Sequence, residues 1–309
     1  MAGASTSCPV CGSTSSKAYL EDVADLFHGV SGTWDLQECT NCSLIYTDPL
    51  IPENRIGDYY PPDYAPYGAT GAVSDSPTIR LLKWVAILPY TLRFGQPGYF
   101  PWPWGNGRLL EVGCGAGRYI QQMLSAGWEC TGLDISTLAV ETARKHNPSA
   151  NFVVGALSDI ETSEKFDLIV MHHVLEHLYH PRQAMATCFG LLNPGGKMVV
   201  NVPNIASWEA KWFGRNWTGL DVPRHIFHFQ ESVLDRLFVD AGFAIEKKRP
   251  GMFASSISES VIMCLPDELR RRIIHTKLER ILYLMLVPVA AISYFFGNRG
   301  TVEIVAVKY

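Results

Sequence analysis

The chain has 309 residues, which is enough for two domains or for one large domain with an appendage. Its composition, 47% hydrophobic and 18% charged, is that of a globular protein and excludes disorder as the main state. The formal net charge of -4 gives no overall basic field to attract a polyanion, so we expect no nucleic-acid partner.

The first residues, MAGASTSCPVCG, lack the basic start and apolar core of a secretory signal. We therefore expect a cytoplasmic protein whose cysteines stay reduced. The longest uncharged apolar stretch, Ile281–Phe296, contains Pro288 and is shorter than the ~20 residues that a spanning helix needs. It can lie on a membrane surface, but we do not expect it to cross one.

Four of the eight cysteines form two C-x-x-C pairs near the N-terminus: Cys8, Cys11, Cys39 and Cys42. Two such pairs can supply the four thiolates of one tetrahedral zinc ion. The spacing predicts a structural zinc ribbon over residues 1–50. Redox-active pairs and unmetallated thiols are the alternatives, and His28, between the pairs, could replace one thiolate.

Residues 51–106 form a connector that is rich in proline. Because proline removes a backbone donor and restricts the chain, this connector cannot be a continuous helix or a central strand. Within it, residues 79–94 are apolar enough to pack as a helix that is broken near Pro89.

From Arg108 onward, short apolar runs alternate with longer amphipathic runs, a pattern typical of a parallel sheet with crossover helices. The predicted strands are 108–113, 129–134, 151–155, 166–171, 197–202, 244–249 and 301–308. The predicted helices include 117–126, 137–146, 181–192 and 231–241. Seven strands, the last two separated by a helical insertion at 251–300, predict one doubly wound α/β domain over residues 107–309.

A glycine-rich turn follows the first of these strands. Glu111 ends the strand, and three glycines at alternate positions from 113 to 117 let the backbone approach a ligand closely. Asp134, at the tip of the next strand, can accept both hydroxyls of a ribose. Glu111 would repel a pyrophosphate, which distinguishes the turn from a dinucleotide site. Taken alone, the turn also fits a simple strand-to-helix connection.

Several strings resemble, in order and spacing, the class I S-adenosylmethionine-dependent methyltransferases, which have a Rossmann-like fold. They are EVGCGAG at 111–117, GLDIS at 132–136, FDLIVMHHVLEHL at 166–178 and LLNPGGKMVVNVPN at 191–204. A further string, WTGLDVPRHIFHF at 217–229, is similar to a bacterial subgroup of polysaccharide, sugar and secondary-metabolite pathways. Some members of that subgroup carry an N-terminal zinc module.

The resemblance implies a set of cofactor-binding residues: Glu111, Gly113, Gly115, Gly117, Asp134, Ala156 and Leu157. The acid and the glycines would line the methionine part of S-adenosylmethionine, and Asp134 would hold its ribose. Ala156 and Leu157 would lie against the adenine. The family commonly has an acid at this last point, whereas here the sequence is GALSD and Asp159 comes later.

The segment from His173 to His177 also matches H-x-x-E-H, a pattern of some zinc peptidases. Similar quinone O-methyltransferases hold a divalent ion at an acid-rich version of this site. A third interpretation, which we favour, is that Glu176 and His177 brace the loop over the cofactor.

Two histidines are candidates for the general base, His173 and His225. We favour His225 because Asp221, four residues earlier, could orient its imidazole, whereas His173 adjoins Glu176. The candidate substrate-contacting residues are Glu176, Asp221 and Arg224. A guanidinium such as that of Arg224 can pair with a phosphate or carboxylate of a substrate.

The insertion at 251–300 begins with basic residues and continues into the apolar run. It can act as a lid. It can pack against the 79–94 helix, or it can face a membrane or a lipid-linked substrate.

The function predicted from the sequence is S-adenosylmethionine-dependent methyl transfer to a small polar acceptor, preferably a hydroxyl of a sugar or related metabolite. Sugar C-methylation and quinone- or lipid-type O-methylation are alternatives, and so is a non-catalytic scaffold that binds the cofactor. Sugar C-methyltransferases generally have another C-terminal domain. The charge and the lack of an N-P-P-Y or D-P-P-Y motif argue against a nucleic-acid methyltransferase.

Overall fold

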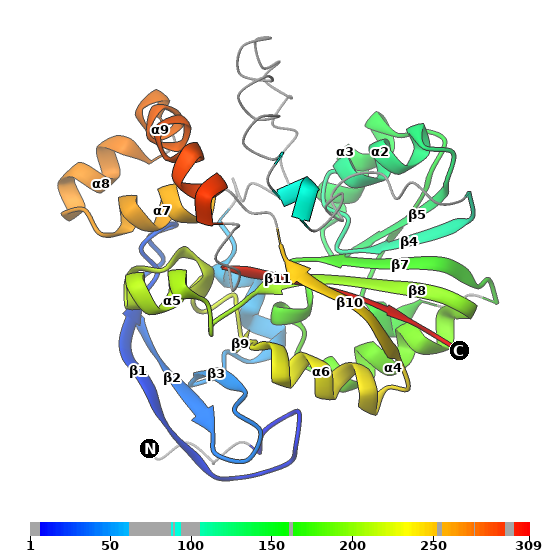
Figure 1. The fold of residues 1–309 in the computed structure, drawn as a ribbon, viewed down its shortest axis with the longest axis horizontal. Coiled ribbons are helices and arrows are strands. Elements are labelled where there is room, and N and C mark those ends of the chain that lie inside the picture. Colours follow the sequence, from blue (N-terminus) through cyan, green and yellow to red (C-terminus); the bar gives the residue numbers. More distant parts are fainter. Residues whose placement is uncertain are drawn as a thin grey trace.

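The computed structural model describes residues 7–61, 88, 90–93, 106–160, 163–251, 255–274, 276–293 and 300–309. Within these ranges the strands form two sheets, one of seven strands and one of four (Figure 1). Residues 88 and 90–93 are helical, and the other residues of the predicted 79–94 helix lie outside the described residues.

The seven predicted strands build the larger sheet, in the order β10-β11-β8-β7-β4-β5-β6. They are β4 (Arg108–Val112), β5 (Glu129–Asp134), β6 (Asn151–Val154), β7 (Phe166–His172), β8 (Leu192–Pro203), β10 (Ala244–Pro250) and β11 (Thr301–Val307). The neighbours from β8 to β6 are parallel, and β11 runs antiparallel to both β8 and β10. The predicted α/β fold with a mostly parallel sheet is confirmed.

Helices cover both faces of this sheet. The four that were predicted are α2 (Arg118–Ser125), α3 (Thr137–His146), α4 (Pro181–Leu191) and α6 (Glu231–Asp240). Side chains alternate across the strands, so Leu109 of β4 packs in the cluster with α2 and α3 while Leu110 packs in the cluster with α4 and α6. The sheet is therefore doubly wound.

Strand β4 lies between β5 and β7, so the chain leaves β4 and β7 toward opposite edges of the sheet. The connections that follow β4 and β7 therefore run in opposite directions across the sheet. In open α/β sheets, ligands bind at this topological switch point. The glycine-rich turn directly follows β4.

The smaller sheet contains β1 (Ser16–Ala24), β2 (Thr33–Cys39), β3 (Ile45–Asp48) and β9 (Phe227–His228), with neighbouring strands antiparallel. We call residues 7–48 the cysteine module. The fourth strand of its sheet is β9, which comes from a distant part of the chain and pairs with β3 (Figure 1). Val10 and Leu44 of the module belong to the same core cluster as α4 and α6.

Short helical segments connect these elements. They are η1 (Glu53–Tyr59), η3 (Leu157–Asp159), η4 (Leu175–His177), α5 (Trp208–Phe213), η5 (Gly214–Asn216) and η6 (Thr218–Leu220). The segments η5 and η6 lead directly into the Asp221 to His228 stretch. The predicted site residues of that stretch are therefore carried by short turns between the two sheets.

The insertion before the last strand is helical, as expected. It contains α7 (Ser255–Met263), α8 (Asp267–Ile273) and α9 (Lys277–Ser293), gathered at one end of the molecule (Figure 1). Among the described residues, none of the helices has both the length and the apolar character needed to span a bilayer.

Candidate functional site

The turn after β4 has left-handed backbone at three glycines, with φ of 71° at Gly113, 49° at Gly115 and 76° at Gly117. L side chains are strained in this region. A Cβ at Gly113 would also overlap Cγ2 of Val174, and one at Gly117 would lie 2.7 Å from the amide nitrogen of Asn147. Both the backbone conformation and the close packing therefore require glycine here.

Asp134, at the end of β5, holds this turn in place. Its Oδ2 accepts a hydrogen bond from the backbone N–H of Gly115 at 2.9 Å, and its Oδ1 accepts one from Ser136 N at 2.9 Å. The carboxylate is buried, which raises its pKa, while the two backbone donors act in the opposite direction. A carboxylate has about four acceptor positions, so capacity remains for ribose hydroxyls.

Glu111 is buried at the end of β4, and its Oε2 has no hydrogen-bond partner among the described residues. Burial, and then the negative charge of Asp134, raise its pKa well above the usual range. A buried carboxyl of this kind would be stabilised as the anion by a nearby cation. S-adenosylmethionine carries both an ammonium and a sulfonium, so Glu111, Asp134 and the glycine turn fit that cofactor.

The predicted adenine-contacting residues follow β6. Ala156 is half-buried, and its N–H donates to Oδ2 of Asp159 at 3.2 Å. Leu157 is buried in the core cluster on the α4 and α6 face. Asp159 thus closes the turn that carries Ala156, and the adenine contact stays a prediction.

The loop after β7 packs directly over the glycine turn. His173 begins it with a φ of 55°, a conformation that is uncommon for a residue other than glycine and is often found at functional sites. Its Nδ1 lies 3.4 Å from Oε1 of Glu176. Because Val174 contacts the backbone at Gly113, this loop places His173 and Glu176 next to the glycine turn.

Glu176 is almost completely buried, and three histidines surround it. Its Oε1 lies 3.8 Å from Nε2 of His225, in addition to the contact with His173. Burial alone would raise its pKa. The His173 contact and the charges of His225, His173 and His177 outweigh burial and lower the pKa. Glu176 lies between the two candidate bases, His173 and His225.

His225 is oriented by a backbone acceptor. Its Nδ1 lies 2.9 Å from the carbonyl oxygen of Gly219, a geometry in which Nδ1–H donates and the other ring nitrogen is left as the acceptor. That Nε2 also lies 3.8 Å from Oδ2 of Asp221. Two carboxylates thus flank the nitrogen that would take a proton.

Arg224 is fully buried and is saturated by the protein itself. Its guanidinium contacts Asp221 through Nε and Nη2, Asp25 Oδ2 at 2.9 Å, and the carbonyl oxygen of Tyr59 at 3.0 Å. Burial opposes the charged form, but the two carboxylates raise the pKa of Arg224 and hold it charged. This arrangement favours a structural role for Arg224 over the expected contact with a substrate.

Two neighbouring histidines, the half-buried His177 and the buried His228, are neutral. Burial, and then the charge of His225, lower the pKa of His177 to about 4 and that of His228 to about 3. His177 contacts the carbonyl oxygen of Arg224 at 2.8 Å and the hydroxyl of Tyr60 at 3.2 Å. These contacts support the expectation that His177 braces the loop.

Among the residues that the structure describes, two groups of side chains have the donor sets and spacing for a metal ion. One is Glu176, His177 and His225, whose ligand atoms lie within 4.8 Å of one another. This group differs from the set read from the H-x-x-E-H pattern, because His225 takes the place of His173. The short loop after β7 is not an α-helix, so His173 and His177 do not share a helix face.

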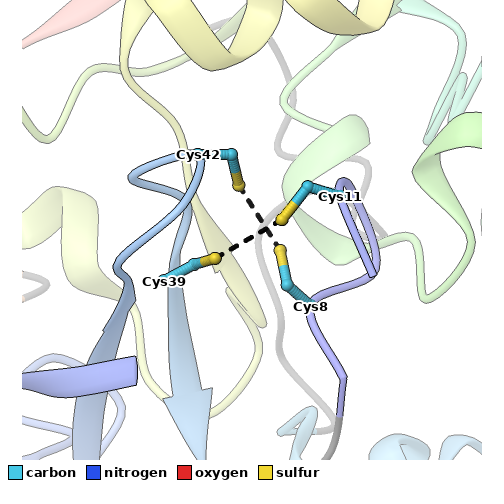
Figure 2. A group of neighbouring side chains, drawn as sticks. All are labelled: Cys8, Cys11, Cys39 and Cys42. Atoms are coloured by element: carbon cyan, nitrogen blue, oxygen red, sulfur yellow. Dashed lines mark hydrogen bonds between the residues drawn. The ribbon is translucent and has the colours of Figure 1, made fainter. Parts of the chain in front are cut away.

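The other group is the four cysteines of the two C-x-x-C pairs (Figure 2). The Sγ atoms of Cys8 and Cys42 are 3.5 Å apart, as are those of Cys11 and Cys39. Zinc–sulfur bonds of ~2.3 Å in a tetrahedron place sulfur atoms about 3.8 Å apart, so this cluster fits a zinc ion. None of the cysteines, all of which lie in described residues, forms a disulfide. His28 is not part of the cluster, and its N–H donates to Asp25.

Other residues at the site were not singled out in the sequence. His172 lies beside Glu111. From the N-terminal part of the chain, Asp25 and Thr47 reach the Asp221 to His228 stretch and Tyr60 reaches His177. The sequence shows two adjacent histidines at 172–173, but the alternation of a strand does not by itself predict that His172 is buried beside Glu111. No local pattern could reveal the other three, because their partners are distant in the sequence.

A family model described as "Methyltransferase domain" matches residues 87–248, just over half of the chain. A protein of Mycolicibacterium smegmatis named "Probable S-adenosylmethionine-dependent methyltransferase" is 30% identical over 142 residues, covering 45% of this chain and 52% of that protein. A Caulobacter protein named "Ubiquinone biosynthesis O-methyltransferase" is 32% identical over 118 residues, covering 36% of this chain and 47% of that protein. The chain thus spans about half the length of these relatives.

The solved structures that resemble this chain include the N-methyltransferase NodS of Bradyrhizobium japonicum in complex with S-adenosyl-L-homocysteine. It is 15% identical, with 76% of this chain and 89% of that chain covered and a TM-score of 0.42. From the family match and the relatives, together with the glycine turn and its two acids, the identity of the chain follows. It belongs to the methyltransferase-domain family.

Proposed function

We propose that the protein transfers the methyl group of S-adenosylmethionine to a hydroxyl of a sugar or a related small polar metabolite, with His225 as the general base. The observation that carries this proposal is the buried cluster around Glu176. In this cluster Nε2 of His225 lies between the carboxylates of Glu176 and Asp221, and Glu176 belongs to the loop that packs against the glycine turn.

When it is bound, the cofactor supplies an electrophilic methyl group on a positively charged sulfur. As that methyl group is transferred to the acceptor oxygen, Nε2 of His225 would take the hydroxyl proton. The hydrogen bond from Nδ1 to Gly219 keeps Nε2 available as acceptor. Glu176 and Asp221 stabilise the imidazolium that forms, because both lie 3.8 Å from Nε2.

The surroundings of Asp221 offer polar groups to an acceptor. A small pocket borders Asp221 and combines aromatic side chains with polar ones. Its lining includes Asp25, Phe27, Arg215, Asn216, Trp217 and Thr218. Aromatic walls with a few polar groups are typical of sites that bind and orient small ligands.

A second candidate is a quinone- or lipid-type hydroxyl. The names of the Caulobacter and Xanthomonas oryzae relatives, both ubiquinone biosynthesis O-methyltransferases, support it. Exposed apolar side chains on α9 also support it, since a lipid-linked acceptor would be met at a membrane surface. Sugar C-methylation and a non-catalytic cofactor-binding scaffold are the remaining alternatives.

The cysteine module supports the proposal of an N-terminal zinc ribbon over residues 1–50. We place a connector at 51–106 and the methyltransferase domain at 107–309. The four converging sulfurs of the module support a structural zinc ion. Because β9 completes the sheet of the module, loss of the metal would reach the methyltransferase domain through that strand.

The acceptor is tested with S-adenosylmethionine labelled in the methyl group. The purified protein is incubated with panels of nucleotide sugars, quinols and lipid-linked sugars, and the product is examined by NMR for the atom that carries the label. We expect an O-methylated sugar. A C-methylated sugar or a methylated quinol would replace the proposal with the corresponding alternative, and no transfer to any class would favour the scaffold.

A further inference from the structure

We infer that Thr47 of the cysteine module is a positioning residue for methyl transfer, acting through the backbone and imidazole of His225. The inference rests on the proposed function only in naming His225 as the base. The N-terminal module and the segment that carries His225 are joined by hydrogen bonds. The module therefore contributes to the geometry of the transfer site.

Thr47 is buried on β3, and its polar groups are turned toward the segment that carries the base. Its hydroxyl donates to the carbonyl oxygen of His225 at 2.9 Å, and its backbone N–H donates to the carbonyl oxygen of Ile226 at 3.0 Å. The same hydroxyl lies 3.3 Å from Nε2 of His228. The side chain of Thr47 thus holds the carbonyl of His225, and its backbone holds the carbonyl of Ile226.

The rest of this segment is held equally firmly. Ile226 N donates to the carbonyl oxygen of Glu176 at 3.1 Å, and Asp25 of the module forms an ion pair with Arg224. The backbone of His225 is therefore clamped between the module on one side and the Glu176 loop on the other. With the backbone held, the orientation of the imidazole is set by its hydrogen bond to the carbonyl oxygen of Gly219.

The geometry explains why a hydroxyl is needed at this position. Without it, the carbonyl oxygen of His225 and the Nε2 of His228 would each lose a partner in a buried setting, which is costly. The segment would shift to find other partners. A displacement of the base by ~1 Å can lower turnover by about 10²-fold, because the proton must leave as the methyl group arrives.

The test compares Thr47→Val, which keeps the shape but lacks the hydroxyl, with Thr47→Ser, which restores it. Thr40→Val is the matched control, because the Thr40 hydroxyl also donates to a backbone carbonyl within the module, that of Ser15, but far from His225. The first readout needs no acceptor. Histidine labelled with ¹⁵N in the ring reports whether Nδ1 of His225 carries the proton, with its signals assigned from His225→Ala.

We expect His225 to be the Nδ1–H form in the wild type, Thr40→Val and Thr47→Ser, and to lose that form in Thr47→Val. With the methyl acceptor found in the labelled screen, Thr47→Val should lower turnover roughly 10²-fold. Cofactor affinity, measured by titration calorimetry, should stay within about twofold in all three variants, because Thr47 does not contact the glycine turn. Should Thr47→Val fail to fold, Asp25→Asn weakens the same clamp through Arg224 and gives the same comparison.

An unchanged His225 tautomer in Thr47→Val together with unchanged turnover would overturn the inference. Equal effects of Thr40→Val and Thr47→Val would also overturn it, since they would show only a general weakening of the module. If the tautomer changes but no variant methylates any sugar, the positioning role stands and the proposed acceptor fails.

Discussion

Nδ1 of His172 lies 3.9 Å from Oε1 of Glu111, yet the pair carries no salt bridge at neutral pH. Burial, and then the charge of His173, lower the pKa of His172 to about 3, so its imidazole is neutral. Glu111 therefore has a buried neutral neighbour and a buried negative one, Asp134. The carboxyl end of β4 therefore holds an acid that would ionise when a cation binds beside it.

This predicts that Glu111 makes the cofactor-free protein less stable as the pH rises. Above the usual carboxyl pKa near 4.5 the unfolded chain loses this proton, while the folded chain retains it because its pKa is raised. The unfolded state then binds fewer protons, so the free energy of unfolding falls with increasing pH. Glu111→Gln should raise the free energy of unfolding at pH 8 and raise it much less at pH 4.

Thermal unfolding at the two pH values checks this expectation, with the exposed Glu141→Gln as control. Glu111→Gln should also bind S-adenosylmethionine more weakly than the wild type. Binding of the cofactor to the wild type should release a proton, which is measured by calorimetry in buffers of different ionisation enthalpy. A gain in stability at pH 8 no larger than that at pH 4 would show that Glu111 is already ionised in the free protein.

Asp134 is predicted to hold the ribose. Asp134→Asn keeps the size of the side chain but removes the charge, and cofactor affinity should fall by about tenfold to a hundredfold, equivalent to ~1.5 to 3 kcal/mol. A 2′-deoxy analogue of S-adenosylhomocysteine provides the control. It should bind less tightly than the parent compound to the wild type but nearly as tightly as the parent to Asp134→Asn. A variant that binds both compounds as the wild type does would remove Asp134 from the site.

Much of the methyltransferase domain could be predicted because its order is local. Parallel strands buried on both faces appear as short apolar runs, and Gly117 followed by an amphipathic segment marks the start of α2. The turn and Asp134 follow from the same regularity, since carboxyl ends of adjacent parallel strands meet at one edge. For this reason the cofactor end of the sheet was the most predictable part of the molecule.

The acceptor side could not be predicted to the same degree. Strand β9 has two residues and exists only because β3, from the other end of the chain, pairs with it. Arg224 was expected to contact a substrate, but its partners Asp25 and the Tyr59 carbonyl come from segments with no visible relation to it. Contacts between distant segments leave no periodic pattern in the sequence.

One zinc ion per chain is predicted in the cysteine module. Cys39→Ser should lose the metal and lower the melting temperature, because metal binding and folding of such modules are coupled. Cys264→Ser, at an exposed cysteine outside the cluster, should keep both. Elemental analysis of protein purified without chelator is the measurement. A metal-free wild type would contradict the prediction.

Association of α9 with anionic membranes is predicted through a stripe of exposed apolar side chains, while Val287 and Ala290 of the same helix are buried. The stripe contains Leu278, Ile281, Met285 and Val289, which are 46–70% exposed. The charges of Arg270 and Arg272 are largely offset by Asp267 and Glu268 on α8, so insertion of the stripe should outweigh electrostatic attraction.

Flotation with anionic vesicles should recover the wild type and lose Ile281→Asp/Met285→Asp. Val239→Asp, at an equally exposed apolar position on α6, should float as the wild type does. Changing Arg270, Arg271 and Arg272 to Glu should weaken the flotation of the otherwise wild-type protein at low salt. Equal flotation of the stripe variant and the wild type would mean that α9 does not meet the membrane.

The most direct test of the account is single-turnover methyl transfer by His225→Ala, His173→Ala and the exposed control His146→Ala, with cofactor affinity measured in parallel. We predict that His225→Ala lowers the transfer rate by ~10² to 10⁴-fold without changing cofactor affinity, because it removes the group that accepts the hydroxyl proton. His173→Ala should have a smaller effect and His146→Ala none. Full transfer by His225→Ala with collapse in His173→Ala would contradict the assignment and move the base to the loop after β7.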